Sequence, residues 1–359
     1  MPEFVHLHVH SQYSFLTSAV KLSGLAAKVK ALGMPAVALT DHANMFGAIR
    51  HYNTCRAAGI QPILGCEVNV ARTAGSAVDH LVLLAATNQG YKNLIQLVSD
   101  GHLSPTSQVA PSISLDQIER HKEGLVVLTG CLGGVVAQRV LEFGPEQADR
   151  VLGELRDRVE PGRLFVELQD HGFPEQPIVN DLLVQAAKRF ELPVVASNDV
   201  HFTSKDDGTA QVYLECVRQG RTYDEAQPLR HDSFEMYLKS PEEMEAKFRA
   251  LPEALSNTLL VRDMCSELKL ELGKPMLPRF PVPEGYDPNS YFRHVSREGL
   301  AARFAEFIRS NKKVNETAYK ERLETELSVI EGMQYAGYFL IVWDFIREAK
   351  SMGIPVGPG

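Results

Sequence analysis

The stretch FVHLHVH at residues 4–10 places three histidines at alternate positions of a short apolar run. Successive side chains of a β-strand point to opposite faces, so this run predicts a strand with His8 and His10 on one face, close to its end. Two imidazoles placed this way can bind the same metal ion. His6 shares their face but lies deeper in the predicted strand, where we interpret it as a core histidine or as a residue that supports a ligand.

Six further apolar runs follow within the first 200 residues, and helical periods separate most of them. Apolar strands that alternate with helices are typical of a parallel sheet that is buried on both faces. Together, the seven runs predict an α/β fold with a closed or nearly closed barrel. The predicted strands are residues 4–10, 35–40, 62–70, 80–85, 124–130, 164–168 and 193–199.

One pair of predicted strands breaks the alternation. Only about nine residues separate the runs 62–70 and 80–85, which is too few for the crossover helix that a parallel pair needs. We therefore predict an antiparallel hairpin with its turn near residues 73–76. Such a hairpin would set Glu67 and His80 almost opposite each other.

Ligand-type side chains gather where the predicted strands end. The carboxyl ends of the strands of an α/β barrel open onto one face, where active sites lie. His80 begins its own run, and the antiparallel hairpin returns it to this face. The side chains that we expect to bind metal are His8, His10, His42, Glu67, His80, Cys131, Asp199 and His201.

Eight ligands are too many for one tetrahedral ion and suit two or three divalent ions that share bridging carboxylates. A mixture of imidazole, carboxylate and one thiolate favours zinc, with manganese or iron as alternatives. Clustered ions are the usual device for phosphoester hydrolysis, because one activates water while another stabilises the leaving oxygen. The pattern therefore predicts a metal-dependent phosphoesterase.

Several neighbouring residues allow two interpretations. Asp41 either orients His42 from behind or simply forms a turn. Asp170 and His171 either support the ligands or contact substrate. Cys66 alternates with Glu67 along its strand, so we expect it on the packing side of the sheet.

Composition and charge limit the class of protein. The 359 residues are 44% apolar and 23% charged, as in soluble globular proteins, and no apolar run approaches a membrane span. The net charge of -8 argues against a stand-alone nucleic-acid-binding domain. Five cysteines without a CxxC pair are typical of reduced thiols. With no export leader recognised, we expect a cytoplasmic protein without membrane contacts.

The character of the chain changes after about residue 205, where helical patterns replace strands. We predict a metal-binding barrel domain with a helical extension at 1–275, a proline-rich linker at 276–288 and a further region at 289–359. The predicted helices are residues 208–219, 241–250, 253–267, 289–309, 317–333 and 338–351.

The motifs FVHLHVHSQYS, LTDHANMFGAI, LTGCLGG and SNDVHF resemble the PHP (polymerase and histidinol phosphatase) domain of bacterial DNA polymerase III alpha subunits. The resemblance continues through SFEMYLKSPEEM and YFLIVWDFIREAKSMGIPVGPG and covers essentially the whole chain. It implies a distorted seven-stranded barrel with a trinuclear metal centre, which in related polymerases acts as a 3′–5′ proofreading exonuclease. The ligands that it implies are the eight named above.

The resemblance also implies a ninth ligand, the aspartate of a YSxLDG motif. Here that motif reads YSFLTS at residues 13–18, so Thr17 stands in place of the carboxylate. A neutral hydroxyl is a poor metal ligand. We therefore expect a weakened third metal site and weakened exonuclease activity.

Residues 289–359 resemble the beginning of the polymerase palm, and we expect the chain to be truncated there. The resemblance implies that the full-length protein is a DNA-directed DNA polymerase, a nucleotidyltransferase of DNA replication. Its partners would be a DNA primer-template, a sliding clamp and other replicase subunits. The PDxDxD pattern of the polymerase site does not occur in these residues, so this chain alone is not expected to polymerise DNA.

A second function from another class stays open. The barrel is either a nuclease or a non-catalytic, metal-stabilised scaffold that docks a separate proofreading exonuclease subunit. The eight ligands favour retained metal, whereas Thr17 favours lost activity.

Overall fold

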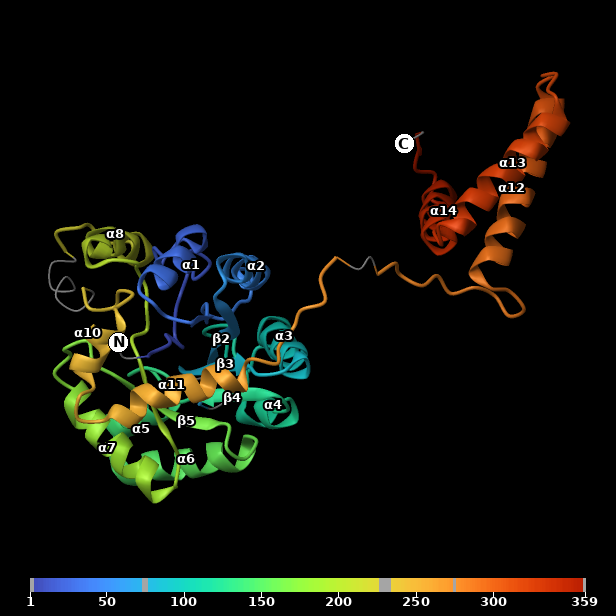
Figure 1. Cartoon of the computed structure of the whole chain (residues 1–359). Helices are drawn as coiled ribbons and strands as arrows, with labels where there is room; N and C mark the ends of the chain where they lie inside the picture. Colours follow the sequence, from blue (N-terminus) through green and yellow to red (C-terminus); the bar gives the residue numbers. More distant parts are fainter. Residues whose placement is uncertain (1–2, 73–76, 226–233, 274–275, 358–359) are drawn as a thin grey trace. The chain divides into compact units, whose positions relative to one another are not determined.

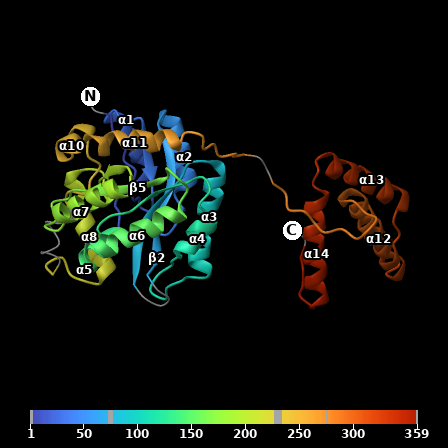
Figure 2. The ribbon, with the colours of Figure 1, turned by 90° about the horizontal axis from the view of Figure 1, so that it is seen from below.

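The computed structural model describes residues 3–72, 77–225, 234–273 and 276–357. The chain forms two compact units, residues 1–270 and 271–359. The first unit is an α/β fold in which helices surround a curled sheet, and the second is helical (Figures 1 and 2). The predicted fold class is therefore confirmed at this level.

The sheet contains six strands, which lie side by side in chain order. The β3 strand runs antiparallel to both of its neighbours, and the other adjacent pairs are parallel. The predicted hairpin is thus confirmed, although its turn at 73–76 lies outside the described residues. The strands are β1 (Ala36–Leu39), β2 (Gln61–Ala71), β3 (Val78–Ala85), β4 (Leu125–Leu128), β5 (Leu164–Gln169) and β6 (Val194–Ser197).

The register of the hairpin differs slightly from the prediction. Glu67 pairs with Val82, and His80 pairs with Asn69. Glu67 and His80 are therefore diagonal neighbours on one face of the hairpin rather than directly opposite residues, a separation that long side chains still bridge.

The prediction of a seventh strand at residues 4–10 is not confirmed. This segment makes isolated parallel bridges, His6 to Val37 and Val9 to Val200. Its backbone bonds are divided between two neighbours: the amide of Ala38 donates to His6 O at 2.9 Å, and the amide of His10 donates to Val200 O at 2.8 Å. Because neither side receives a continuous ladder, the segment links β1 to the end of β6 without being a regular strand.

Helices cover the outside of the sheet, and α3, α4 and α10 begin at a side-chain cap. The Thr87 hydroxyl accepts the Gly90 amide at the start of α3, and Ser114 and Gln117 form a capping box at the start of α4. The helices of this unit are α1 (Leu22–Ala31), α2 (Ala48–Ala58), α3 (Asn88–Leu103), α4 (Leu115–Arg120), α5 (Val135–Phe143), α6 (Pro145–Arg158), α7 (Gln176–Arg189), α8 (Gly208–Gln219), α10 (Pro241–Lys247) and α11 (Pro252–Met264), with a short 3-10 turn η1 (Lys205–Asp207) before α8.

Alternating side chains divide the core into two layers. The inner layer includes Ile63, Leu84 and Phe165, together with Val261 of α11. The outer layer packs between the strands and the surrounding helices and contains Cys66, as predicted. These layers bury apolar surface on both faces of the sheet, which is the main stabilising contribution of such a core.

The inner face changes from apolar to polar along the strands. In β2, Ile63 is followed four residues later by Glu67, and in β5, Phe165 is followed two residues later by Glu167. Since side chains two and four residues apart share a face, both carboxylates point into the curled sheet beyond its apolar layer. This change positions the candidate site.

The second unit has its own small core. It packs Phe292 of α12 (Pro288–Arg309), Leu327 of α13 (Glu316–Gly332) and Leu340 of α14 (Ala336–Ser351) against one another. Its helices agree with the predicted ones within two residues at each end. None of the helices in the described parts of the chain has the length and apolar character that crossing a membrane requires.

Candidate metal centre

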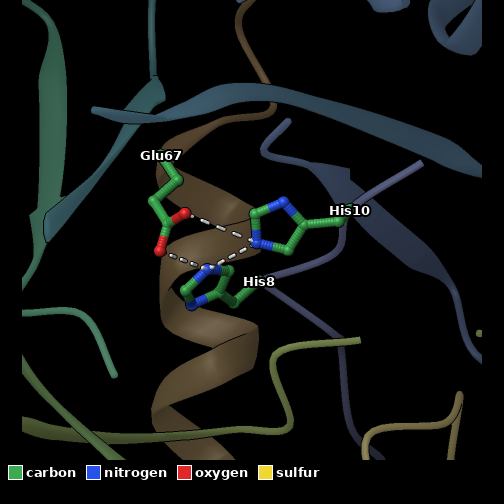
Figure 3. Close-up of side chains that lie close together, drawn as sticks. All are labelled: His8, His10 and Glu67. Atoms are coloured by element: carbon green, nitrogen blue, oxygen red, sulfur yellow. Dashed lines mark hydrogen bonds and ion pairs between the residues drawn. The ribbon is translucent and has the colours of Figure 1, made fainter. Parts of the chain in front are cut away.

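Three overlapping groups of ligand-type side chains lie at the polar end of the barrel. In each group, one ligand atom from every residue lies within 4.8 Å of the others. Figure 3 shows the first group. His10 and Glu67 each belong to two groups, so the three form one continuous cluster. The groups are His8, His10 and Glu67; His10, Asp199 and His201; and His42, Glu67 and His80.

Glu67 lies at the middle of this cluster. Its Oε2 is 2.7 Å from His42 Nδ1, and its Oε1 is 3.1 Å from His80 Nδ1 and 3.5 Å from His8 Nε2. Burial opposes ionisation, yet the surrounding imidazoles, His80 foremost, hold the pKa of Glu67 well below its usual range. Glu67 therefore remains an anionic group, and it belongs to two of the three groups.

Asp199 is the carboxylate on the other side of the cluster. Its Oδ1 lies 3.1 Å from His201 Nε2, 3.2 Å from His10 Nε2 and 3.4 Å from His8 Nε2. Burial opposes ionisation here too, but His8 and His201 hold the pKa of Asp199 well below its usual range. The residue has a left-handed φ of +40°, a conformation that aspartate adopts more readily than most residues and that is frequent at functional sites.

The carboxylates change the protonation of the imidazoles around them. Although burial opposes charging, Asp199 and Glu167 raise the pKa of His8, Glu67 raises that of His80, and Asp199 raises that of His201. Without metal, the negative charge is balanced by protons on these imidazoles. A divalent cation replaces such protons when it binds, so the donor set of imidazoles and buried carboxylates fits a cationic group.

Cys131 lies at the edge of the cluster, after β4. Its Sγ is 3.9 Å from His80 Nδ1, and it is outside the three groups above. Burial, together with the nearby Asp199 and Glu67 carboxylates, raises the pKa of the Cys131 thiol well above its usual value. The thiol therefore stays protonated unless a cation binds beside it.

Asp41 contacts the residues around the cluster through Ser11 and Ser14. Its Oδ1 accepts the Ser11 amide at 2.6 Å and the Ser14 hydroxyl at 2.7 Å. The Ser14 Oγ in turn lies 2.9 Å from His10 Nδ1. Asp41 thus orients His10 through Ser14, and the same Ser14 Oγ accepts the His42 backbone amide at 3.0 Å, while the His42 ring contacts Glu67.

Thr17 contacts the cluster through its backbone. Its carbonyl oxygen lies 2.6 Å from His201 Nδ1, while its hydroxyl donates to Ser14 O at 3.0 Å. A carbonyl can only accept, so His201 carries its proton on Nδ1 and turns Nε2 toward Asp199. Thr17 therefore lies beside His201, but its hydroxyl is directed to the Ser14 backbone.

The two predicted residues Asp170 and His171 lie in different environments. Asp170 accepts the Gly172 amide at 3.2 Å and lies 3.6 Å from Lys247 Nζ, with 40% of its side chain exposed, so it lies outside the cluster. His171 is buried behind Asp199, with its Nε2 3.1 Å from Asn198 O. Burial lowers the pKa of His171 to about 4, which is typical of a neutral supporting residue.

Sequence reasoning missed Glu167, which lies on β5 directly behind the cluster. Its Oε1 is 2.8 Å from His8 Nδ1, and both side chains are fully buried. The available signal was an acidic residue within the apolar run LFVELQ. Most of the predicted ligands lie at or just after the ends of strands, whereas Glu167 lies within β5, two residues before its end.

Comparison with known proteins identifies the family of this barrel. Residues 6–171 match the sequence model of the PHP domain. The barrel belongs to the PHP family. Residues 290–359, which include most of the second unit, match the model described as the bacterial DNA polymerase III alpha NTPase domain.

The whole chain is similar to the N-terminal part of DNA polymerase III alpha subunits. It is 38% identical to the alpha subunit of Borreliella burgdorferi over 99% of this chain. It is 37% identical to the alpha subunit of Escherichia coli K12 over 100% of this chain. In both cases it spans about 31% of the relative. Among solved structures, an amidohydrolase from Chromobacterium violaceum is similar to part of this chain, with a TM-score of 0.40 and 14% identity over 55% of this chain and 87% of that one.

Proposed function

We propose that the PHP barrel holds two or three divalent metal ions and hydrolyses phosphodiester bonds in the manner of a 3′–5′ proofreading exonuclease. The observation that carries this proposal is the sharing of His10 and Glu67 among three ligand groups. Zinc is the favoured metal, with manganese or iron as alternatives. Bound ions of this kind activate water and stabilise a leaving oxygen. The proposed ligands are His8, His10, His42, Glu67, His80, Cys131, Asp199 and His201.

The protein side chains divide the centre into a closed and an open side. The side chains of His8 and His10 are almost fully buried, whereas those of His42 and His80 are 36% and 29% exposed. We propose that a phosphodiester approaches from the side of His42 and His80. The buried pair instead excludes water and holds the geometry of the centre, with Asp41 and Glu167 behind it.

We further propose that the complete protein is a DNA-directed DNA polymerase of DNA replication. The match of residues 290–359 and the similarity to alpha subunits support this activity. Its proposed partners are a DNA primer-template, a sliding clamp, other replicase subunits and a separate exonuclease subunit, and its proposed location is the cytoplasm.

A second candidate function is a metal-stabilised scaffold without nuclease activity that docks a separate proofreading exonuclease. Thr17 favours it, because the hydroxyl of this residue donates to Ser14 O and supplies no anionic ligand. Both functions need bound metal, but only the first needs turnover.

Two measurements on one preparation of the protein distinguish the two functions. The metal content is measured first, and the release of nucleotides from 3′-labelled single-stranded DNA is then followed with and without a chelator. We expect hydrolysis that disappears on chelation, returns with added metal and is lost in His10→Gln. The matched control His121→Gln removes a half-buried imidazole outside the cluster and should retain hydrolysis. Metal without hydrolysis supports the scaffold, and a metal-free protein excludes both functions.

A further inference from the structure

Glu167 is a charged side chain enclosed within the barrel. It lies on β5, and its side chain is fully buried. Isolated buried carboxylates are costly, so such a group is expected to be fully hydrogen-bonded. Both of its oxygens have partners, and the partners come from different parts of the chain.

The first oxygen, Oε1, faces His8. It lies 2.8 Å from His8 Nδ1 and accepts the Gln169 side-chain amide at 2.9 Å, and the Ser197 hydroxyl also donates to it. A carboxylate has no proton to give, so His8 must carry a proton on Nδ1. The other ring nitrogen, Nε2, then faces Glu67 and Asp199, and a cation that binds there would take the place of its proton.

The second oxygen, Oε2, holds the turn after β4. It accepts the backbone amide of Gly130 at 3.1 Å. Gly130 has a left-handed φ of +85°, and a Cβ added there would approach His80 O to 3.1 Å, so glycine suits this tight turn. The next residue is Cys131, whose sulfur reaches toward His80. Glu167 thus holds the backbone that presents the thiol.

We infer that Glu167 is a positioning residue that fixes two candidate ligands at once, the imidazole of His8 and the thiol of Cys131. This inference rests on the metal centre proposed above and adds a role for a residue outside its ligand set. One carboxylate links a ligand from the first segment of the chain to a ligand after β4. Loss of its charge should therefore alter two distant ligand positions together.

The variant Glu167→Gln separates the two contacts. An amide has one accepting oxygen and one donating nitrogen, so it cannot accept from both His8 and Gly130. If its oxygen keeps one of them, its NH2 group faces the other, either forcing the opposite tautomer of His8 or repelling the Gly130 amide. The matched control is Gln169→Met, which removes another contact of Oε1 and leaves His8 and Gly130 in place.

The test is cobalt titration of the purified metal-free chain, with circular dichroism to establish folding. Visible bands report the geometry around cobalt, and a near-ultraviolet band reports a bond to the Cys131 thiolate. We expect Glu167→Gln to weaken cobalt binding by about 10- to 100-fold and to reduce the thiolate band, as for other residues that orient ligands. Gln169→Met should bind cobalt like the wild type.

Two further outcomes complete the test. If Glu167→Gln does not fold, Glu167→Asp replaces it, since the shorter carboxylate reaches only one of the two partners and should still lower the thiolate band. Wild-type affinity and spectra in the folded variant would overturn the inference while leaving the metal centre intact. A wild-type protein that takes up no cobalt would overturn the metal centre itself and this inference with it.

Discussion

The imidazole rings of His10 and His201 stack with their centroids 4.4 Å apart. His10 belongs to the first segment of the barrel, and His201 follows its last strand, β6. Next to the stacked rings, the His10 backbone amide donates a hydrogen bond to Val200 O, and this bond links the two parts. Because the same contact joins the ends of the barrel and assembles one ligand group, metal binding and barrel stability should be coupled.

This coupling predicts that removal of metal destabilises the protein. A ligand that binds only the native state stabilises it by about 4 kcal/mol at a thousandfold excess over its Kd. We expect a chelator to lower the Tm of the wild type in calorimetry. A Tm that is the same with and without chelator, in a protein that contains metal, would contradict the coupling.

Glu67→Gln should impair the centre more than any change outside it. The amide removes the charge shared by two ligand groups, so metal content should fall by about one ion per chain or more, and hydrolysis by about 100-fold. Elemental analysis and the nuclease assay measure both effects. The control Glu146→Gln changes an exposed residue in the first turn of α6 and should leave both values unchanged.

Thr17→Asp tests the missing ninth ligand. The carboxylate should increase metal occupancy, because it adds an anion beside His201, whereas wild-type hydrolysis should be weak. Thr17→Asn has a similar shape without the charge and serves as the control. Equal metal content in all three proteins would mean that this side chain does not face the centre, and strong wild-type hydrolysis lost in His8→Ala would mean that threonine is tolerated.

His51 should make stability depend on pH. It is buried on α2, with its Nε2 3.1 Å from Val37 O, and burial lowers its pKa from 6.5 to about 4. Above pH 6.5 both folded and unfolded states are neutral. Between pH 6.5 and 4 only the unfolded state gains the proton, so stability falls as the pH falls, by about 2 kcal/mol at pH 5.

Urea unfolding at pH 7 and pH 5 measures this contribution. His51→Gln should lose less stability between the two pH values than the wild type, by about 2 kcal/mol, because glutamine does not titrate. The control His121→Gln removes an imidazole that is only half buried. An identical pH dependence in wild type and His51→Gln would show that His51 is not held neutral in the native state.

Strand periodicity was sufficient to predict most of the curled sheet. The runs that became β1 to β6 are β-branched or apolar, and the short connection before His80 indicated the antiparallel hairpin. Periodicity could not show that residues 4–10 divide their backbone bonds between Val37 and Val200, since that depends on how the sheet curls. The exact pairing of Glu67 likewise depends on a turn that composition does not determine.

The site was predictable where ligands follow strands and less so behind them. His8 and His10 lie in one group as the alternation of side chains implied, and His10 lies in another with His201, as the shared face at the strand ends implied. Glu167 was missed because a single carboxylate in an apolar strand gives no hint of its partner. Asp170, one residue before the buried His171, lies near Lys247 and not in the cluster. In a loop after a strand, the direction of a side chain does not follow the strand alternation and cannot be predicted from it.

Elemental analysis of the purified chain after exhaustive dialysis tests the central claim most directly. The measurement counts transition-metal ions per chain and needs no assumption about substrate. The shared His10 and Glu67 predict two or three ions per chain. Fewer than about one ion per chain would contradict the assignment of this cluster as a multinuclear metal centre.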